Sequence, residues 1–453
     1  MLWSTTYLDR GCCDWRDIME ELLKIAKNKG VSAEVYALKQ VSDNFSFENG
    51  EFKNIESSKS SGVSLRIIKD GMLGFAYTRN LKNTEELFNN AILGVREKVE
   101  AHFEFPFTDK VENIRTYDEK LEEIKNEEIV EECERVINEL KKRVKGQINI
   151  FSFKSSSEIN ILNTSGTNLR SKRTEFIIHI HINFPNTYAG IERMLLSRSF
   201  KMVDEDIIQF VSSLYNAGEN VVHTKGGRMK VLFLPETMFV LLWRLLSGSN
   251  GMSLYLKETP LIGKIGERIF SEKLSIYNDP LNEDFVYSTP FDDEGVPCRR
   301  FPIVEKGVFK NFFFDLYYAG KTGNRSTGNG FRSGFWGGDP IRIKPIPMLT
   351  SIYIEKGDRS FDELIRMMDR GIIVAGQLGA HSGNIPNGDF SIGLSPGIYV
   401  EDGKIKGRVL DAMVSGNIYE VMKDVIGVED KVYPSFLGYY PSILFDNVSV
   451  AMK

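Results

Sequence analysis

The sequence predicts an α+β fold, with an N-terminal α+β domain of hairpins and amphipathic helices and a β-rich C-terminal domain with a few buried helices. In "EFIIHIHINF", residues 175–184, apolar side chains occupy every second position, which is typical of a β-strand. The Asn49-Gly50 pair indicates a hairpin turn, because both turn positions favour residues that tolerate positive φ. Apolar residues three and four apart in "MEELLKIAKNKG" predict an amphipathic helix over 19–30.

The other elements of the N-terminal half follow in order along the chain. Strands come after the first helix, and a second hairpin is predicted to turn at Asp70-Gly71. A helix over 84–102 comes next, with acidic residues in its first turn. A helix over 126–144 has glutamates at its start and basic residues at its end, which suits the helix dipole. The remaining elements predicted for this half are strands between 147 and 184 and a helix at 205–216.

We place a domain boundary near residue 220, where "HTKGGR" interrupts the pattern before a buried strand, "MKVLFLP". Residues 19–220 then form the N-terminal α+β domain and residues 221–453 the β-rich domain. Residues 1–18 are interpreted as an N-terminal extension that is non-native or disordered, so Met1 and Met19 stand as alternative starts. The hairpins predicted in the second domain turn at Lys306-Gly307 and at Asp402-Gly403.

Composition narrows the class of protein. The chain has 453 residues, of which 42% are hydrophobic and 26% charged, as in soluble globular proteins of two or three domains. Its net charge of −5 and lack of a basic stripe argue against direct binding of nucleic acid. No apolar run is long enough for a membrane span, and the N-terminus lacks the pattern of a signal peptide. The cysteines show no C-x-x-C spacing, which favours reduced thiols in the cytoplasm; they are Cys12, Cys13, Cys133 and Cys298.

His179 and His181 raise the question of a metal site, since alternation points both imidazoles to one face of the predicted strand. A pair of this kind supplies at most two of the three or four ligands that zinc needs. The other interpretation is a strand whose polar face is in water. The spacing favours this second interpretation.

Two segments, one rich in glycine and one in charge, are candidate sites. "GKTGNRSTGNG", residues 320–330, lacks the glycine of a phosphate-binding loop, because Asp315 stands at that position. It is interpreted as a flexible loop that lets a partner or ligand approach the backbone closely. "FDDEGVPCRRFP", residues 291–302, contains three acids and two arginines, and both a metal site and a salt-bridged turn remain open for it.

His381, Ser382 and Asp389 provide the residue types of a nucleophilic triad. Neighbouring residues of an extended chain point to opposite faces, so His381 is poorly placed to activate Ser382. The chain also contains no H-E-x-x-H motif. A hydrolytic site of either kind is therefore disfavoured.

Five motifs of the C-terminal half, in order and with similar spacing, resemble the TldD/PmbA family, which is often labelled "modulator of DNA gyrase". They are "DDEGVPCRR", "EKGVFKNFFFDLYYAGKTG", "STGNGFR", "HSGNIPNGDFSIGLSPGIYVEDGKI" and "SGNIYEVM". In the N-terminal half, "FENGEFKNIESSKSSGVSLRIIKDGMLGFAYT" and "NTSGTNL" are similar to the family's hairpins. The resemblance implies a cytoplasmic metallopeptidase system.

The family comprises two kinds of subunit. Members of the TldD type carry zinc on a His-Glu-x-x-x-His helix, with a later cysteine completing the site, and members of the PmbA type, also called TldE, pair with them and lack these ligands. Here the corresponding helix, "LPETMFVLLWRLLSGSNG", contains Glu236 but no histidine or cysteine, and no cysteine follows Cys298. Its residues are apolar almost all round, which predicts a core helix.

The resemblance implies that this chain is a non-catalytic PmbA/TldE-type subunit that binds no cofactor itself. It would pair with a zinc-bearing TldD-type catalytic subunit, as a heterodimer or larger complex, and act on unfolded or extended peptides. A homodimer is the alternative for the isolated chain. The loops predicted to contact peptide or partner contain Asp292, Asp293, Glu294, Asn329, Arg332, His381, Ser382, Asn384 and Asp389.

Two alternative functions remain. An active metalloprotease would need a zinc site from ligands that are scattered in the sequence: His179, His181, His223, His381 and the acids at 292–294. A regulator of DNA gyrase without peptidase activity is the other. The missing basic stripe argues against direct contact of such a regulator with DNA.

Overall fold

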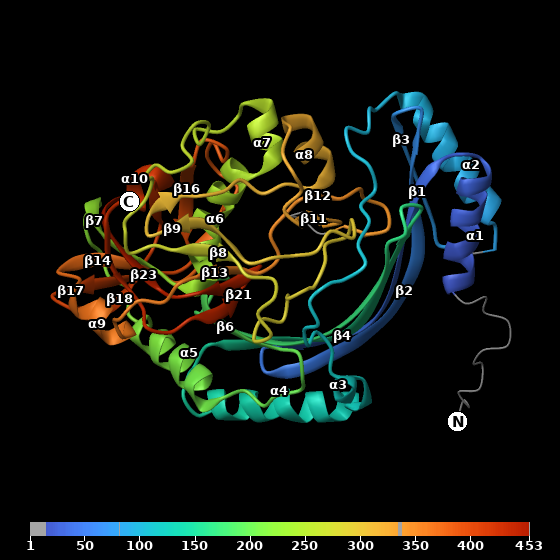
Figure 1. Cartoon of the computed structure of the whole chain (residues 1–453). Helices are drawn as coiled ribbons and strands as arrows, with labels where there is room; N and C mark the ends of the chain where they lie inside the picture. Colours follow the sequence, from blue (N-terminus) through green and yellow to red (C-terminus); the bar gives the residue numbers. More distant parts are fainter. Residues whose placement is uncertain (1–14, 81, 334–337, 453) are drawn as a thin grey trace, which may run out of the picture.

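The computed structural model describes residues 15–80, 82–333 and 338–452. Figure 1 shows a long curved sheet from the N-terminal half that bends along one side of a more compact C-terminal half. Helices cover the outer side of the curved sheet, and the C-terminal half lies against its inner side. The fold is α+β, as the sequence predicts.

The first sheet has the strand order β3-β2-β1-β4-β5-β6, and every neighbouring pair is antiparallel. Its strands are β1 (Ser32–Glu48), β2 (Glu51–Lys69), β3 (Met72–Thr78), β4 (Gln147–Asn163), β5 (Asn168–Asn183) and β6 (Gly190–Ser197). The two predicted hairpin turns are confirmed. Asn49 and Gly50 have φ of 54° and 72°, and Asp70 and Gly71 have φ of 51° and 76°, as such turns require.

Side chains of β1 alternate between the two faces of this sheet. Ala33, Val35 and Ala37 pack on the outer face against α1 (Trp15–Asn28) and α2 (Thr84–Gly94). Tyr36 and Leu38 point to the inner face and pack there with residues of the C-terminal half. The other helices of the N-terminal half are η1 (Val95–Glu97), α3 (Glu119–Glu123), α4 (Asn126–Lys141) and α5 (Glu205–Ala217).

Two predicted helix boundaries are corrected. The first helix begins at Trp15 instead of Met19, because Ile18 (4% exposed) and the partly buried Trp15 continue its apolar stripe by one turn. The helix predicted over 84–102 ends at Gly94, where a Cβ would lie 3.1 Å from the backbone N of Phe75 and where a short 3₁₀ turn follows. The predicted extension over 1–18 therefore overlaps α1, and its residues 1–14 lie outside the described residues.

The C-terminal half contains two larger sheets and a short ribbon. The larger mixed sheet consists of β7 (Gly227–Phe233), β14 (Arg370–Val374), β15 (Gln377–Leu378), β16 (Asp389–Leu394), β17 (Gly397–Glu401), β18 (Lys404–Val409), β19 (Ala412–Asn417), β20 (Val425–Val428) and β23 (Ile443–Met452). The second consists of β8 (Ile276–Asn278), β9 (Phe301–Glu305), β10 (Val308–Phe309), β13 (Ile352–Ile354), β21 (Tyr433–Ser435) and β22 (Gly438–Tyr440). The ribbon pairs β11 (Gly330–Phe331) with β12 (Ile346–Pro347).

The predicted core helix is α6 (Pro235–Ser249), which lies in the main hydrophobic cluster of the C-terminal half. Val240, Leu241 and Leu245 are fully buried, and Trp243 is 8% exposed. The prediction of a core helix is confirmed. The other helices of this half are α7 (Gly251–Leu256), α8 (Leu316–Thr322), α9 (Phe361–Arg366) and α10 (Ile418–Val421).

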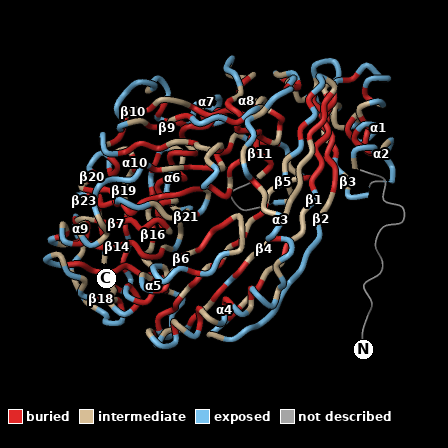
Figure 2. Tube along the Cα trace, turned by 60° about the horizontal axis from the view of Figure 1, so that its bottom comes forward, coloured by how far each residue is buried: buried red, intermediate tan, exposed pale blue. Residues whose placement is uncertain are grey.

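The predicted domain boundary near residue 220 falls between α5 and β7. Buried side chains do not separate there, because Val211 of α5 and Leu232 of β7 belong to one cluster that also includes residues of α4 and β14. Figure 2 shows this continuity as buried trace that runs from the long strands into the C-terminal half. The boundary stays a prediction, and the two halves share part of their core.

Candidate functional site

The nine residues predicted to contact peptide or partner lie in two separate places. Asp292, Asp293 and Glu294 form a turn beside Asn329 and Arg332, at the inner face of the first sheet. His381, Ser382, Asn384 and Asp389 belong to a loop next to α6. The first group is largely buried, whereas His381 and Asn384 of the second are exposed.

The first group belongs to a buried network of charges. Arg66 of β2 donates to Glu34 of β1 (Nη2 to Oε2, 2.8 Å) and to Glu294 (Nη1 to Oε1, 2.6 Å). Arg332 also pairs with Glu34 (Nη2 to Oε1, 3.3 Å), and the side chains of all four residues are at most 3% exposed. Burial alone would lower the pKa of Arg66, but the carboxylates of Glu34 and Glu294 outweigh it and raise this pKa. The network is a clamp between β1, β2 and the turn at 292–294.

The remaining carboxyl groups near this clamp accept backbone hydrogen bonds. Asp292 accepts from the N–H groups of Val296 (2.9 Å) and Gly330 (2.8 Å), which links the turn to β11. Asp315 caps α8 by accepting from Tyr318 N–H (2.8 Å). Burial, followed by the charge of Glu294, raises the pKa of Asp315 to about 8.

Burial revises the role predicted for four of the nine residues. Asp292, Glu294, Asn329 and Arg332 are at most 1% exposed, so they offer almost no surface to a peptide or partner outside this chain. Of the two interpretations left open for the acidic turn, its contacts with Arg66 and with backbone N–H groups fit the salt-bridged turn. Within the described ranges, no three histidine, cysteine or acidic side chains are grouped so that they could hold a metal ion.

Asp293 is half-buried and, with Arg332, lines a cavity of about 290 Å³ between the inner face of the first sheet and the C-terminal half. Arg173 and Glu175 of β5 and Tyr287 line it as well. Burial raises the pKa of Glu175, against the opposing effect of Arg173. The cavity therefore presents positive and negative side chains beside aromatic and aliphatic walls. This lining suits a ligand with a polar backbone and apolar side chains.

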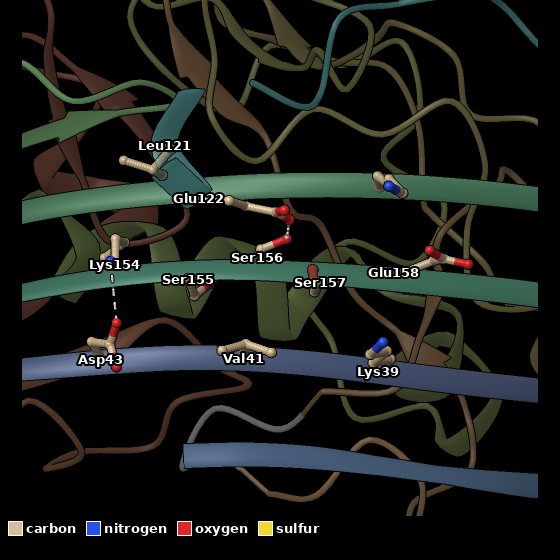
Figure 3. A pocket seen from close by; sticks show the side chains of 11 residues that line it. Lys39, Val41, Asp43, Leu121, Glu122, Lys154, Ser155, Ser156, Ser157 and Glu158 are labelled. Carbon is tan, nitrogen blue, oxygen red and sulfur yellow. Dashed lines mark hydrogen bonds and ion pairs between the residues drawn. The ribbon is translucent and has the colours of Figure 1, made fainter. Parts of the chain in front are cut away.

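A second cavity, of about 350 Å³, lies where β1 and β4 run beside α3, as Figure 3 shows. Lys39, Val41 and Asp43 point into it and alternate with Gln40, which lines the cavity of the inner face. Lys154 pairs with Asp43 (Nζ to Oδ2, 3.2 Å) across its floor, and Glu122 accepts a hydrogen bond from a serine of β4. Among the charged residues that line it, Lys154 and Asp43 pair with each other, and Glu158 pairs with Arg170 outside it.

The loop at 379–389 is fixed to α6 by Arg244, a residue that the sequence analysis did not single out. Its guanidinium donates to the carbonyl oxygens of Ser382 (Nη2, 2.8 Å) and Asp389 (Nε, 3.0 Å), while the side chain is fully buried. Burial lowers the pKa of Arg244 to about 10. His381 and Asn384 are exposed on this anchored loop.

The Asp389 carboxylate accepts a hydrogen bond from Asn417 (2.8 Å), and its backbone carbonyl is held by Arg244. The backbone carbonyl of Ser382 likewise accepts a hydrogen bond from Arg244. These contacts explain the positions of both residues as parts of the loop and its anchor. The triad that the sequence analysis disfavoured therefore gains no support from them.

Glu236 of α6 takes part in a buried ion pair. Arg193 of β6 donates to it (Nε to Oε1, 2.8 Å), and both side chains are at most 5% exposed. The Arg193 guanidinium lies between two rings, 3.5 Å from the centroid of Phe210 and 4.2 Å from that of Tyr433. In a His-Glu-x-x-x-His pattern placed on Glu236, the histidine positions fall on Pro235 and Val240, which have no side-chain donor for a metal. The residues of α6 do not fit a zinc site.

The histidine pair lies on β5 with the predicted alternation. Phe176, Ile178 and Ile180 are fully buried, whereas His179 and His181 are half-buried on the other face. His179 contacts Glu192 of β6 (Nε2 to Oε2, 3.1 Å), and burial lowers the pKa of His181. The contact gives His179 an acidic neighbour on the next strand.

The buried partners Glu34, Arg66 and Arg193 were also missed from the sequence. Glu34 and Arg66 each interrupt an apolar stretch of a strand, as Arg66 does between Leu65 and Ile67, whereas Arg193 follows Glu192. A charged residue at such a position is the signal that could have identified them, since an isolated buried charge is costly and demands a partner. The sequence does not show which residues pair with them, because Glu294 is 228 residues from Arg66.

Comparison with known proteins gives consistent results for both halves. The model of the PmbA/TldA metallopeptidase C-terminal domain matches residues 226–452, and that of PmbA/TldA metallopeptidase domain 1 matches residues 33–93. A metalloprotease of Methanothermobacter thermautotrophicus is 25% identical over 91% of this chain and 91% of its own length. Other relatives bear the TldD name or the PmbA name.

Two solved structures share the fold over nearly the whole chain. TldE from Thermococcus kodakarensis is 26% identical with a TM-score of 0.87, and the match covers 96% of this chain and 100% of that one. A putative modulator of a DNA gyrase from Thermotoga maritima is 25% identical with a TM-score of 0.85, at the same coverage of both chains. No helix among the described residues is long and apolar enough to cross a membrane.

Proposed function

Because the chain belongs to the PmbA/TldD family of metallopeptidase-type proteins, we propose that it is the non-catalytic, PmbA/TldE-type subunit of a cytoplasmic peptidase complex. Its partner is a TldD-type subunit, which brings the zinc. This chain contributes walls of the chamber that holds an unfolded or extended peptide. An active metalloprotease and a gyrase regulator without peptidase activity are the alternatives.

The pairing of Glu236 with Arg193 is the observation that carries this proposal. A glutamate that assists metal chemistry must face its metal and water, whereas Glu236 is 5% exposed and faces a guanidinium enclosed by Phe210 and Tyr433. Pro235 and Val240 offer no ligand beside it. In this proposal the helix has a structural role, and it lacks the ligands that a catalytic zinc site would need there.

The direct test is peptidase activity of each subunit alone and of the mixture. We expect no turnover of unfolded peptide by this chain, and chelator-sensitive turnover once a TldD-type subunit is added. Size-exclusion chromatography of the same samples should show a defined complex. Chelator-sensitive cleavage by this chain alone, at the rate of the mixture, would support the active metalloprotease instead.

The exposed loop at 379–389 is the proposed contact with peptide or partner. Arg244 fixes its backbone to α6, so the exposed side chains of His381 and Asn384 are presented from a rigid support. We expect the double variant His381→Ala, Asn384→Ala to weaken assembly or peptide capture while its thermal midpoint stays within about 2 °C of the parent. His223→Ala is the matched control, since this histidine is also exposed on a loop. Equal loss in the control would refute the assignment.

A further inference from the structure

Two neighbouring motifs of the sequence, at 292–300 and 320–330, meet at one cavity that the proposed function leaves unused. The cavity has a volume of about 380 Å³ and receives Arg299 from "DDEGVPCRR" and Arg325 from "GKTGNRSTGNG". Leu254 of α7 lines it, and so does Asn324, which follows the end of α8; Figure 1 shows these two helices adjacent to each other in the C-terminal half. Both arginines are exposed.

The charge of this cavity is positive and unbalanced. Arg299 and Arg325 make no ion pair or hydrogen bond with any described residue, whereas the neighbouring Arg300 pairs with Asp279 (Nε to Oδ2, 3.3 Å) and stacks on Tyr277. Among the described residues, no aspartate or glutamate lines the cavity. An anionic group that enters it therefore meets two guanidinium groups that need not first give up a partner.

The walls are apolar. Phe312 and Phe314, at 6% and 5% exposed, form its inner side, and Leu254 of α7 lines it as well. Ile265 lines the cavity while 61% exposed, so its side chain offers apolar surface to a ligand. The neutral polar groups are engaged within the chain, as Asn311 donates to Pro302 O and Thr327 to Asn329.

We propose that this cavity binds a peptide segment in which a carboxylate lies next to a bulky apolar side chain. The carboxylate is held by Arg299 and Arg325, and the apolar group fills the space between Ile265 and the two phenylalanines. A C-terminal carboxylate and an aspartate or glutamate side chain share this chemistry. That the ligand is a peptide rests on the proposed function; the anion-binding, apolar character of the cavity does not.

The test uses fluorescence anisotropy on the purified chain without a partner subunit. The probe is a labelled glycine-serine peptide that ends in phenylalanine with a free carboxylate. Its C-terminal amide, and an amidated peptide with an internal aspartate before phenylalanine, are compared with it. We expect the uncharged amide to bind at least about tenfold more weakly than the free acid, since it loses a charge-assisted contact.

Variants separate the two parts of the site. Arg299→Gln with Arg325→Gln should weaken binding of the free acid by about tenfold or more, and Ile265→Ser should weaken it only for peptides with an apolar end. Arg366→Gln, an exposed arginine at the end of α9, is the matched control and should bind as the parent does. Thermal unfolding checks that each variant is folded.

The outcomes are distinct. Strong binding of the internal aspartate peptide, lost in the double arginine variant, supports the proposal with a side-chain carboxylate as the ligand. Equal binding of the free acid and the uncharged amide, or unchanged binding by the double arginine variant, would overturn it. Because no partner is present, these results are independent of whether the mixed complex cleaves peptides.

Discussion

Arg66 illustrates how a single residue of a strand links distant parts of this chain. It lies on β2, contacts Glu34 on β1 and reaches Glu294 in the acidic turn of the C-terminal half. A buried ion pair is costly to assemble because both charges leave water, but breaking one leaves an uncompensated charge behind. The network therefore fixes which parts of the two halves meet.

The first prediction is that Arg66→Met lowers the free energy of unfolding by about 3–5 kcal/mol, because Glu294 is left buried without its guanidinium partner. Lys264→Met is the control. Its ion pair with Glu267 has the same kind of distance (2.7 Å) but lies at the surface, so its loss should cost at most about 1 kcal/mol. Urea unfolding measures both. Similar small changes in the two variants would mean that Arg66 is not part of a buried network.

The second prediction concerns pH. The carboxyl of Asp315 ionises near its ordinary pKa of about 4 in the unfolded chain but at about 8 when folded. Between these values the folded chain holds a proton that the unfolded chain has released. The stabilisation from this group is thus complete below about pH 4 and is lost as the pH rises towards 8.

Asp315→Asn keeps a side-chain oxygen for the N–H of Tyr318 and does not titrate. Relative to this variant, the parent should lose more than about 1 kcal/mol of stability between pH 5 and pH 8 in urea unfolding. Parallel curves for the two proteins across that range would show that the folded carboxyl ionises normally.

At the scale of elements, α6 is a helix whose position in the core follows from its composition. The third prediction is that Trp243→Ala costs about 3–5 kcal/mol, the usual cost of truncating a large buried aromatic side chain. Phe436→Ala is the control, because Phe436 belongs to the same aromatic group, 4.7 Å from Phe239, but is 45% exposed. It should cost about 1 kcal/mol. An unchanged thermal midpoint for Trp243→Ala would mean that the helix is a partner-binding surface.

Local chemistry was enough to predict the hairpins and the type of most helices. Asn49 and Asp402 adopt positive φ because the turn type demands it, whatever surrounds them. The end of α2 was not predictable, because it depends on the close approach of Gly94 to Phe75 on strand β3. The start of α1 could have been recognised from Ile18, which continues the spacing of Met19 and Leu22.

The candidate site was predictable only in part. The density of acids at 292–294 identified an unusual turn. The arginine that pairs with Glu294, Arg66, lies on a strand 228 residues earlier. Because Asp292 and Glu294 are buried, they are interpreted as parts of the clamp and not as surface contacts. Arg299 and Arg325 could not be paired from sequence, since their common cavity exists only in the folded chain.

At the scale of the whole molecule, the two halves are joined by a shared hydrophobic cluster and by the ionic clamp. The cavity of about 290 Å³ lies between them, beside the clamp, so its shape depends on the same contacts that hold the halves together. This arrangement supports a role in holding a peptide while the reaction takes place on a partner. The central claim is that the chain contributes no zinc site of its own.

The most direct test of that claim is elemental analysis of the purified chain, expressed and dialysed with zinc present. We expect well under one zinc per protomer, because Glu236 is paired with Arg193 and because His179, His181 and the adjacent Glu192 are not arranged as a group that could hold a metal ion among the described residues. The double variant His179→Ala, His181→Ala should contain the same small amount. One zinc per protomer in the parent, lost in that variant, would contradict the account and place a metal site on β5.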